Sequence, residues 1–392
     1  MAIRSWNDSA QGSVSRREIS DGCEVLNRRR WLAALARGGS GGVAALLLAQ
    51  TGPQSAWSED SSVMNWPSRL LASPNGRADE RAPVITATKI RHGGQEFATA
   101  GDDHRIYLWR LIDGQLIRKL NGHQDWVQTL AYSPNGEWLA SAGNDRRILI
   151  WDVERGSLAQ TLADPREAVT GLSWSPDGSQ LAAVGLEDRL RLYNTKTWQV
   201  EKELVCPSGD IRCVDHSADQ RWLVVAGRQG HVRLWDRSQN DRVQDYQPHR
   251  QRVRALGFAP DSDYLVSAGE DRKIHVLDVA HGNAAFELPG STAKILALTF
   301  YGSHELATGG SDNLIRLWNL AERRELGTLA GHRGSVASLS GNGAVLISSG
   351  FDTEVRIWTI SAHVARERPA ATRTSRKEGR DDGFRDGSRK SD

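Results

Sequence analysis

The chain has 392 residues, of which 25% are charged and 39% hydrophobic, as in an ordinary soluble protein. Its formal net charge of +2 comes from the ends, because residues 1–60 and 362–392 are basic while residues 61–361 carry a net charge of −2. A central region of this charge argues against a general nucleic-acid binder, which needs basic residues to displace counterions from phosphates.

Residues 1–60 have the features of a leader and linker. The run Arg28-Arg29-Arg30-Trp31-Leu32 precedes a Gly/Ala-rich apolar stretch that ends at Ala49. Two arginines, one residue, an aromatic residue and leucine resemble the bacterial twin-arginine export signal, and a functional signal predicts an exported, periplasmic protein. Without that function the run belongs to a leader of a cytoplasmic protein, and the cleavage position stays open. No uninterrupted apolar stretch of 18 residues occurs, so no transmembrane span is expected.

The stretch Gly122–Asp152 shows the unit from which the central region is built. An alternating apolar segment leads through a Pro-Asn-Gly turn at 134–136 to a second apolar run, Trp138–Ala142. A polar corner at Asp145 then precedes a third run that ends on Trp151. Three short strands separated by turns predict an antiparallel meander, and a single meander cannot bury its own apolar faces.

The unit recurs along the chain. Its strand-end position is occupied, at steps of 42, 42, 42, 42, 41 and 40 residues, by Trp109, Trp151, Tyr193, Trp235, Leu277, Trp318 and Trp358. An aspartate stands six residues before this position in five units, at Asp103, Asp145, Asp271, Asp312 and Asp352. Gly-His near the start and Trp-Asp near the end of a unit of this length resemble the WD40 repeat family.

This resemblance implies an all-β fold, a seven-bladed WD40 β-propeller over residues 61–361 with four antiparallel strands per blade. Blade 1 then ends at Trp109 and blade 7 at Trp358. Blade 7 has no convincing outer strand after its tryptophan, so we expect a strand near 69–73 to complete it, with Val364–Arg368 as the alternative. Residues 362–392 have the composition of a disordered charged tail.

In the WD40 family the histidine, a strand Ser or Thr, the corner aspartate and the strand-end tryptophan form a hydrogen-bonded chain inside a blade. The resemblance implies two complete structural tetrads, one of His123, Ser141, Asp145 and Trp151 and one of His332, Ser348, Asp352 and Trp358. Serine, histidine and aspartate also make a hydrolase triad, but a catalytic site is singular, whereas this set recurs in several blades. We therefore expect no enzyme activity, no cofactor and no metal site.

The rim that bears the histidine and corner positions is the expected partner-binding surface. Adding the repeat spacing places basic residues of blades 4 to 6 on one sector, namely Arg212, Arg228, Arg252, Arg254 and Lys294. Asp210 and Glu270 offset part of this charge, and Trp126 and Phe351 are aromatic candidates beyond the sector. Because arginine and aromatic residues anchor interfaces, this rim predicts a binding face for an acidic segment of a protein partner. Solvated charges on a propeller rim are the alternative.

The sequence thus predicts a monomeric, non-catalytic scaffold that binds protein partners and no nucleic acid. The alternatives are a ligand-binding or enzymatic propeller that uses the channel mouth, and a nucleic-acid-associated factor. Cys206 and Cys213 lie on either side of the connection between blades 3 and 4. They either pair in an oxidising compartment or fill blade interiors as small apolar residues, which is the interpretation we favour.

Overall fold

The computed structural model describes residues 63–64, 68–71 and 82–360, apart from 163–164, 207–208, 262–263, 280, 282 and 344. The chain divides into two units, Met1–Trp57 and Ser58–Asp392, and every described residue belongs to the second. The arginine-rich leader, the tail at 362–392 and the alternative closing strand Val364–Arg368 lie outside the described residues. Within the described part of the chain, no helix is long and apolar enough to cross a membrane.

Seven separate sheets account for the strands of the described residues. Blade 1 contains β3 (Ile85–Ile90), β4 (Glu96–Gly101), β5 (Arg105–Arg110) and β6 (Leu116–Asn121). Blade 2 contains β7 (Val127–Tyr132), β8 (Trp138–Gly143), β9 (Ile148–Asp152) and β10 (Ser157–Leu162). Blade 3 contains β11 (Val169–Trp174), β12 (Gln180–Gly185), β13 (Arg189–Asn194) and β14 (Val200–Val205).

The other four blades repeat this pattern with small variations. Blade 4 contains β15 (Ile211–His216), β16 (Trp222–Gly227), β17 (Val232–Asp236), the 3₁₀ turn η1 (Arg237–Gln239) and β18 (Arg242–Tyr246). Blade 5 contains β19 (Val253–Phe258), β20 (Tyr264–Gly269), β21 (Ile274–Asp278) and β22 (Asn283–Leu288). Blade 6 contains β23 (Ile295–Phe300), β24 (Glu305–Gly310), β25 (Ile315–Asn319) and β26 (Arg324–Leu329), with β1 (Val63–Met64) parallel to β26. Blade 7 contains β27 (Val336–Asn342), β28 (Val345–Gly350), β29 (Val355–Thr359) and β2 (Ser68–Leu70).

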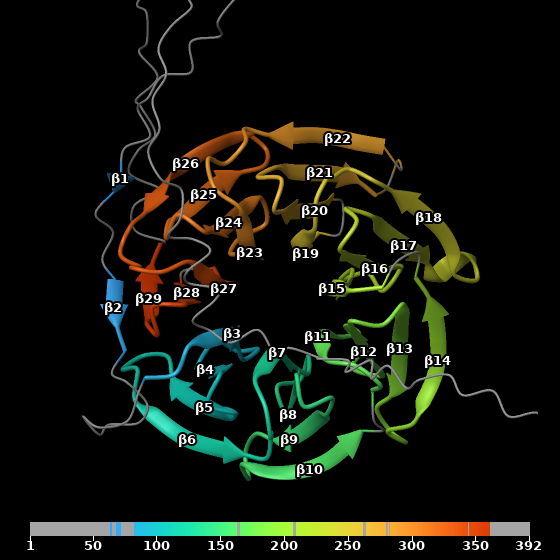
Figure 1. Ribbon diagram of the computed structural model, residues 1–392, viewed down its shortest axis with the longest axis vertical. Helices are drawn as coiled ribbons and strands as arrows, with labels where there is room; N and C mark the ends of the chain where they lie inside the picture. The colour runs from blue at the N-terminus through green and yellow to red at the C-terminus, as the bar shows by residue number, and fades with distance from the viewer. Residues whose placement is uncertain are drawn as a thin grey trace, which may run out of the picture. The chain divides into compact units, whose positions relative to one another are not determined.

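The seven blades are arranged around a common centre, with the first strand of each blade innermost (Figure 1). Every innermost strand contacts the innermost strands of both neighbouring blades, and β27 of blade 7 contacts β3 of blade 1. Hydrogen bonds join these last two strands, among them those from the Thr88 and Ile90 amides to the hydroxyls of Ser338 and Ser340, each 3.0 Å long. The ring is therefore closed, and the prediction of a seven-bladed propeller with antiparallel blades is confirmed.

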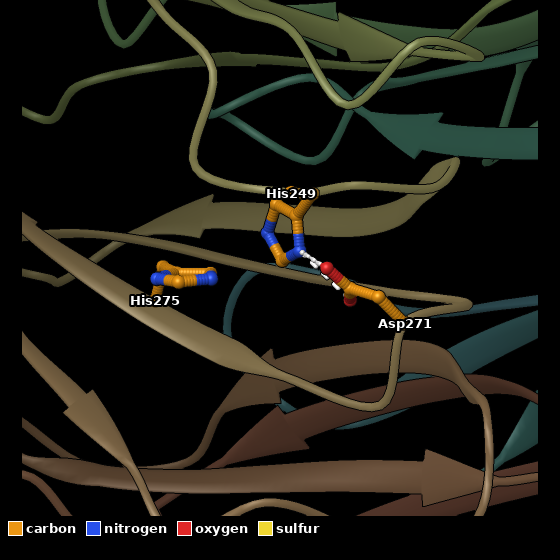
Figure 2. Close-up of side chains that lie close together, drawn as sticks. All are labelled: His249, Asp271 and His275. Carbon is orange, nitrogen blue, oxygen red and sulfur yellow. Dashed lines mark hydrogen bonds and ion pairs between the residues drawn. The ribbon is translucent and has the colours of Figure 1, made fainter.

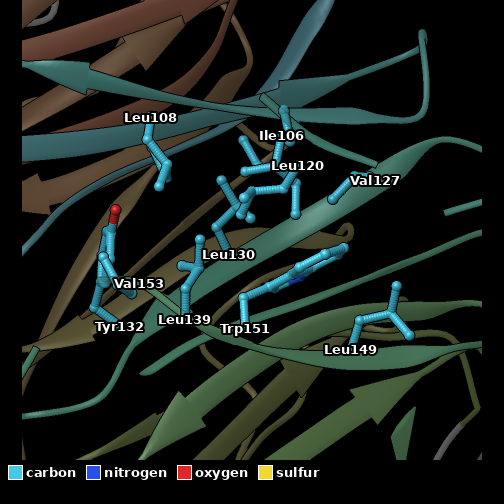
Figure 3. Close-up of a cluster of buried hydrophobic side chains, with 13 residues drawn as sticks. Ile106, Leu108, Leu120, Val127, Leu130, Tyr132, Leu139, Leu149, Trp151 and Val153 are labelled. Carbon is cyan, nitrogen blue, oxygen red and sulfur yellow. The ribbon is translucent and has the colours of Figure 1, made fainter. Parts of the chain in front are cut away.

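The hydrophobic core lies between neighbouring blades rather than within one, which is why a single unit cannot fold by itself. Ile106, Leu108 and Leu120 of blade 1 pack against Leu130, Leu139 and Trp151 of blade 2 (Figure 3). Each fully buried side chain of this size contributes about 1.5–3 kcal/mol to folding. The alternating apolar pattern of the strands thus supplies one buried face to each neighbouring blade.

A glycine at the end of the second strand fixes how closely the corner approaches the innermost strand. The Cβ of any other residue at Gly143 would lie 1.9 Å from the carbonyl oxygen of Trp126, which is closer than atoms can pack. The Asn144 amide instead donates to this carbonyl over 2.9 Å, so the corner stays hydrogen-bonded to the rim. The rim loops of each blade are therefore held against its innermost strand.

The outer strand of blade 7 comes from the N-terminal side of the ring. β2 pairs antiparallel with β29, with Ser68 opposite Trp358, and the Leu71 amide donates to the Val355 carbonyl over 3.0 Å. Leu71 is buried in the cluster between blades 7 and 1, and the Arg69 guanidinium donates to carbonyls of the β5–β6 turn. Of the segment that sequence analysis proposed for this position, 69–71 are described and 72–73 are not.

Candidate functional site

The four residues of each sequence-derived tetrad meet inside their blade. In blade 2, Ser141 Oγ lies 2.8 Å from the Trp151 indole nitrogen and 2.7 Å from His123 Nε2, and His123 Nδ1 lies 2.8 Å from Asp145. In blade 7, Ser348 makes the same contacts with Trp358 and His332, and His332 with Asp352, over 2.8, 2.7 and 2.8 Å. The indole and imidazole N–H groups and the hydroxyl thus each find an acceptor in the interior. The chains join strands two, three and the rim loop of a blade.

The corner aspartates are ionised members of these chains. Burial raises the pKa of Asp145, but the hydrogen bonds from the His123 ring and the Gln124 amide outweigh it, and the pKa lies below its usual value. Burial and the His332 hydrogen bond act on Asp352 in the same way, with the same net lowering of its pKa. Both carboxylates therefore accept hydrogen bonds at neutral pH.

Blades without the histidine satisfy the corner acid differently. In these blades the residue two positions before the strand end contacts the acid instead, as with Tyr107 and Asp103, Arg191 and Glu187, and Arg316 and Asp312. In blade 3 every tetrad member is replaced. The replacing residues line a small cavity at the place where blades 2 and 7 have their hydrogen-bonded tetrad, and they are Pro165, Ala183, Glu187 and Tyr193. The contact between the corner acid and the residue two positions before the strand end was not predicted from the sequence, although a tyrosine or arginine at this position in each of these units, which lack the histidine, indicates it.

A cluster of alternating charges links blades 4, 5 and 6 on the rim. Arg252 lies between two acids, 2.9 Å from Asp210 and 3.3 Å from Glu270. Asp210 also contacts Arg212 over 2.5 Å, and Glu270 contacts Arg254 over 3.9 Å and Lys294 over 3.3 Å. We call these six residues the rim cluster. Four cations therefore share two carboxylates, so the cluster keeps a net positive charge.

The Arg254 guanidinium is affected by its burial and by this excess positive charge. Burial and then the neighbouring Arg212 lower the pKa of its guanidinium, although the group stays protonated at neutral pH. Of the four cations, Lys294 has an exposed side chain, 54% accessible, whereas the side chains of Arg212, Arg252 and Arg254 are half-buried. An anion placed against this sector would meet a cation that lacks full compensation.

The remaining residues proposed for the rim surface lie at different places. Arg228 is exposed, and its amide donates to the Asp210 carbonyl over 3.1 Å, so it borders the rim cluster. Trp126 is half-buried in blade 2, and Phe351 is 50% exposed in blade 7. Neither aromatic residue belongs to blades 4 to 6. The structure thus groups the basic residues together and leaves the aromatic ones on other blades.

A family model described as the IFT122 first beta-propeller matches residues 84–341, which is most of the ring. The chain belongs to this WD40 propeller family. Three relatives match shorter stretches. Nuclear distribution protein PAC1 of Mycosarcoma maydis is 41% identical over 69 residues, which cover 18% of this chain and 14% of PAC1. Mitochondrial division protein 1 of Aspergillus oryzae is 30% identical over 108 residues, 27% of this chain and 16% of the relative.

The third relative is a p21-activated protein kinase-interacting protein 1-like protein of Danio rerio, 38% identical over 68 residues, 17% of this chain and 18% of its own length. The WD40 propeller therefore matches less than a fifth of each of these three relatives. Segments of this size span one to three blades, so the similarity to these relatives identifies the repeat.

A second group of polar side chains lies buried at the far ends of the innermost strands β11 and β15. Ser173 Oγ is 3.2 Å from Asp215 and 3.1 Å from His216 Nδ1, and the Phe258 amide donates to Asp215. Burial lowers the pKa of His216 to about 4 and raises the pKa of Asp215. In a hydrolase triad the imidazole lies between serine and carboxylate, whereas here the serine contacts both. This arrangement holds neighbouring innermost strands of the WD40 propeller together, and sequence analysis did not find it.

The two described cysteines are free thiols. Burial raises the pKa of Cys206 and of Cys213 to about 12 each, so both stay protonated at neutral pH. Buried protonated thiols are poor nucleophiles and poor metal ligands. In the WD40 propeller they fill space, as the apolar interpretation of the sequence has it.

Proposed function

We propose that this WD40 propeller is a non-catalytic platform that binds an acidic segment of a protein partner at the rim cluster. The carrying observation is the imbalance of four cations against two carboxylates across blades 4 to 6. A rigid ring presents this sector without reorganisation, so little conformational entropy is lost when a partner docks. The kinship with a protein named for interaction with p21-activated protein kinase supports a binding role.

The electrostatics favour a carboxylate-rich partner. Arg212, Arg252 and Arg254 keep much of their side-chain surface buried, so they are pre-positioned by the blade and the acids. A carboxylate that approaches Arg254 adds a charge-assisted hydrogen bond to a guanidinium that is only partly compensated. Electrostatic contacts of this kind raise the association rate and weaken with salt.

The alternative of an enzymatic site at the channel mouth has less support. The serine, histidine and aspartate sets of blades 2, 5 and 7 are repeated, and in blades 2 and 7 the hydroxyl accepts an indole N–H. A hydroxyl held in this way serves the blade rather than a substrate. We propose that the protein acts as a monomer and carries out no reaction of its own.

The first experiment is recovery of the tagged full-length protein from its own cells, followed by mass spectrometry of the companions. The proposal predicts a stoichiometric protein partner with an acidic segment, released by moderate salt. Absence of any companion under mild conditions contradicts a platform role. An enriched small molecule with no protein would instead favour the ligand-binding alternative.

The rim cluster is tested by Arg254→Gln combined with Lys294→Gln, which leaves Arg252 with both of its acids. Loss of the partner with an unchanged melting temperature is the expected result. Lys202→Gln on β14 is the matched control, because it also removes a lysine that contacts a carboxylate, that of Asp241, on the outer strand of blade 3 and outside the rim cluster. Equal recovery of the partner with all three proteins would exclude the rim cluster.

We also propose that the leader at 1–60 directs export through the twin-arginine route, on the sequence run at Arg28–Leu32. Replacing Arg28 and Arg29 by lysine is expected to retain the protein in the cytoplasm at full length. Intact mass and cell fractionation measure this directly. A protein that is full-length and cytoplasmic before any substitution contradicts export.

A further inference from the structure

Blade 5 departs from the tetrad pattern in a way that changes its chemistry. His249 contacts Ser267 through Nε2 over 2.9 Å and both oxygens of Asp271 through Nδ1 over 3.0 Å each. The strand-end residue is Leu277, so no indole at this position donates to Ser267. Ser141 and Ser348, by contrast, each accept an indole hydrogen bond. The Ser267 hydroxyl, which contacts His249, can therefore accept a further hydrogen bond.

A second histidine lies beside this pair. His275 belongs to β21, and its ring stands edge-on to the His249 ring, with the centroids 4.6 Å apart and the planes at 90°. Figure 2 shows one ring nitrogen of His275 turned toward the pair of His249 and Asp271. Its Nδ1 lies 4.0 Å from Glu287, while its Nε2 is buried and has no hydrogen-bond partner. A buried nitrogen without a partner needs an explanation, because burial removes its bond to water.

The three side chains have the composition of a transition-metal site. One nitrogen of each histidine and one carboxylate oxygen of Asp271 all lie within 4.8 Å of one another. Two imidazoles and one carboxylate are ligands that zinc prefers, with bonds of about 2.0–2.1 Å. Ligand atoms around a tetrahedral ion are about 3.3 Å apart on these bond lengths, so the His275 ring needs to move by at most about 1.5 Å.

We propose that His249, Asp271 and His275 bind one Zn²⁺ ion on blade 5, with His275 Nε2 as a ligand and a water molecule in the fourth position. His249 coordinates through Nδ1, and the proton of that nitrogen passes to Nε2, which then donates to Ser267 Oγ. No proton is lost in this exchange of tautomers. Ser267 contacts the outer nitrogen of His249 over 2.9 Å, as the partner of a metal-bound histidine does, and the Glu287 carboxylate lies 4.0 Å from the outer nitrogen of His275.

The other cluster of potential ligands supports the choice of blade 5. His332, Asp352 and Glu354 of blade 7 also lie within 4.8 Å of one another. There, however, Ser348 already accepts from Trp358, and Glu354 is held by Arg356 at 2.8 Å. Opening that cluster would break contacts that blade 5 lacks. Blade 7 therefore serves as the internal control.

The test is calorimetric titration of Zn²⁺ into the untagged full-length chain, previously treated with a chelator, beside two variants. His275→Leu installs the residue that blade 2 has at the same position, Leu149, and Glu354→Gln removes the third group of the blade 7 cluster. We expect one ion per chain in the wild type and in Glu354→Gln, and at least a hundredfold weaker binding in His275→Leu. No binding to the wild type, or equal binding to His275→Leu, overturns the proposal.

Absorption of the Co²⁺-loaded wild-type chain gives a second reading that needs no variant. Tetrahedral Co²⁺ with nitrogen and oxygen ligands absorbs visible light far more strongly than the octahedral aqueous ion, and Zn²⁺ should abolish the signal by displacement. A weak, octahedral spectrum would also overturn the proposal, even if His275→Leu proved unstable. The melting temperature in chelator shows separately whether the variant is folded.

Discussion

The comparison of Ser141→Ala with Ser267→Ala isolates the contribution of the indole hydrogen bond to a blade. Both serines are buried, 0% and 4% exposed, and the hydroxyl of each contacts a histidine Nε2, over 2.7 and 2.9 Å. Of the two, only Ser141 also accepts from a tryptophan, Trp151, which is 2% exposed. Removing Ser141 therefore strands a donor and an acceptor, whereas removing Ser267 strands an acceptor alone.

A stranded buried polar group costs about 1–3 kcal/mol. We expect Ser141→Ala to lower the free energy of unfolding by about 3 kcal/mol and Ser267→Ala by about 1.5 kcal/mol. In a domain of this size, a difference of about 1.5 kcal/mol corresponds to about 3 °C in melting temperature. Thermal scans of both variants in the presence of a chelator measure this difference and keep metal binding out of it. Equal shifts, or a larger shift for Ser267→Ala, would refute the assignment of the extra stability to the indole.

Three further predictions concern closure of the ring and its titrating groups. Starting the chain at Pro83 removes β2 and the buried Leu71, so we expect a loss of about 3 kcal/mol or more in calorimetry, and an unchanged melting temperature contradicts the closing role of β2. Burial depresses the pKa of His216 to about 4, below the value of about 6.5 for the unfolded chain. The neutral ring therefore contributes its full share to the free energy of unfolding above about pH 6.5, and this share is lost as the pH falls toward 4. His216→Phe, which copies Phe258 of the next blade, should flatten the pH dependence of the melting temperature in that window, and parallel curves would count against it. Asp145→Ala should cost about 1–3 kcal/mol at pH 7. Because the folded pKa of Asp145 is depressed, that cost should shrink below about pH 4, and a pH-independent cost would argue against an ionised carboxylate.

Most of the fold could be predicted from the repeat period. Strand-end residues at a near-constant spacing located the third strand of every blade, and the turn at 134–136 separated the first two strands of blade 2. The tetrads of blades 2 and 7 follow from the same spacing, because residues at equal positions of equal units meet equal neighbours. Their geometry required only the family pattern and the residue types.

Side-chain contacts between different blades could not be predicted from the repeat spacing. The Asp210–Arg252–Glu270 chain crosses from blade 4 to blade 5, and the pairing of Ser173 with His216 joins blades 3 and 4. Spacing places such residues on the same rim or the same end of the ring but does not say which rotamers bring them together. The same limit applies to His275, since a histidine in a strand is more often a lone polar residue than a ligand.

The seating of β2 against β29 also sets the order in which the ring can be completed during synthesis. The residues that bond across this seam, Ser68 and Arg356, are 288 positions apart. At about 5–20 residues per second, the ribosome needs roughly 15–60 s to supply the second partner after the first. For that time the short N-terminal strand has no place to pair, and a chain released before blade 7 is made presents open blade faces and the apolar residue Leu71. The ring of this protein therefore closes late in synthesis. We expect chaperones that cover blade edges to bind the nascent chain until translation reaches β29.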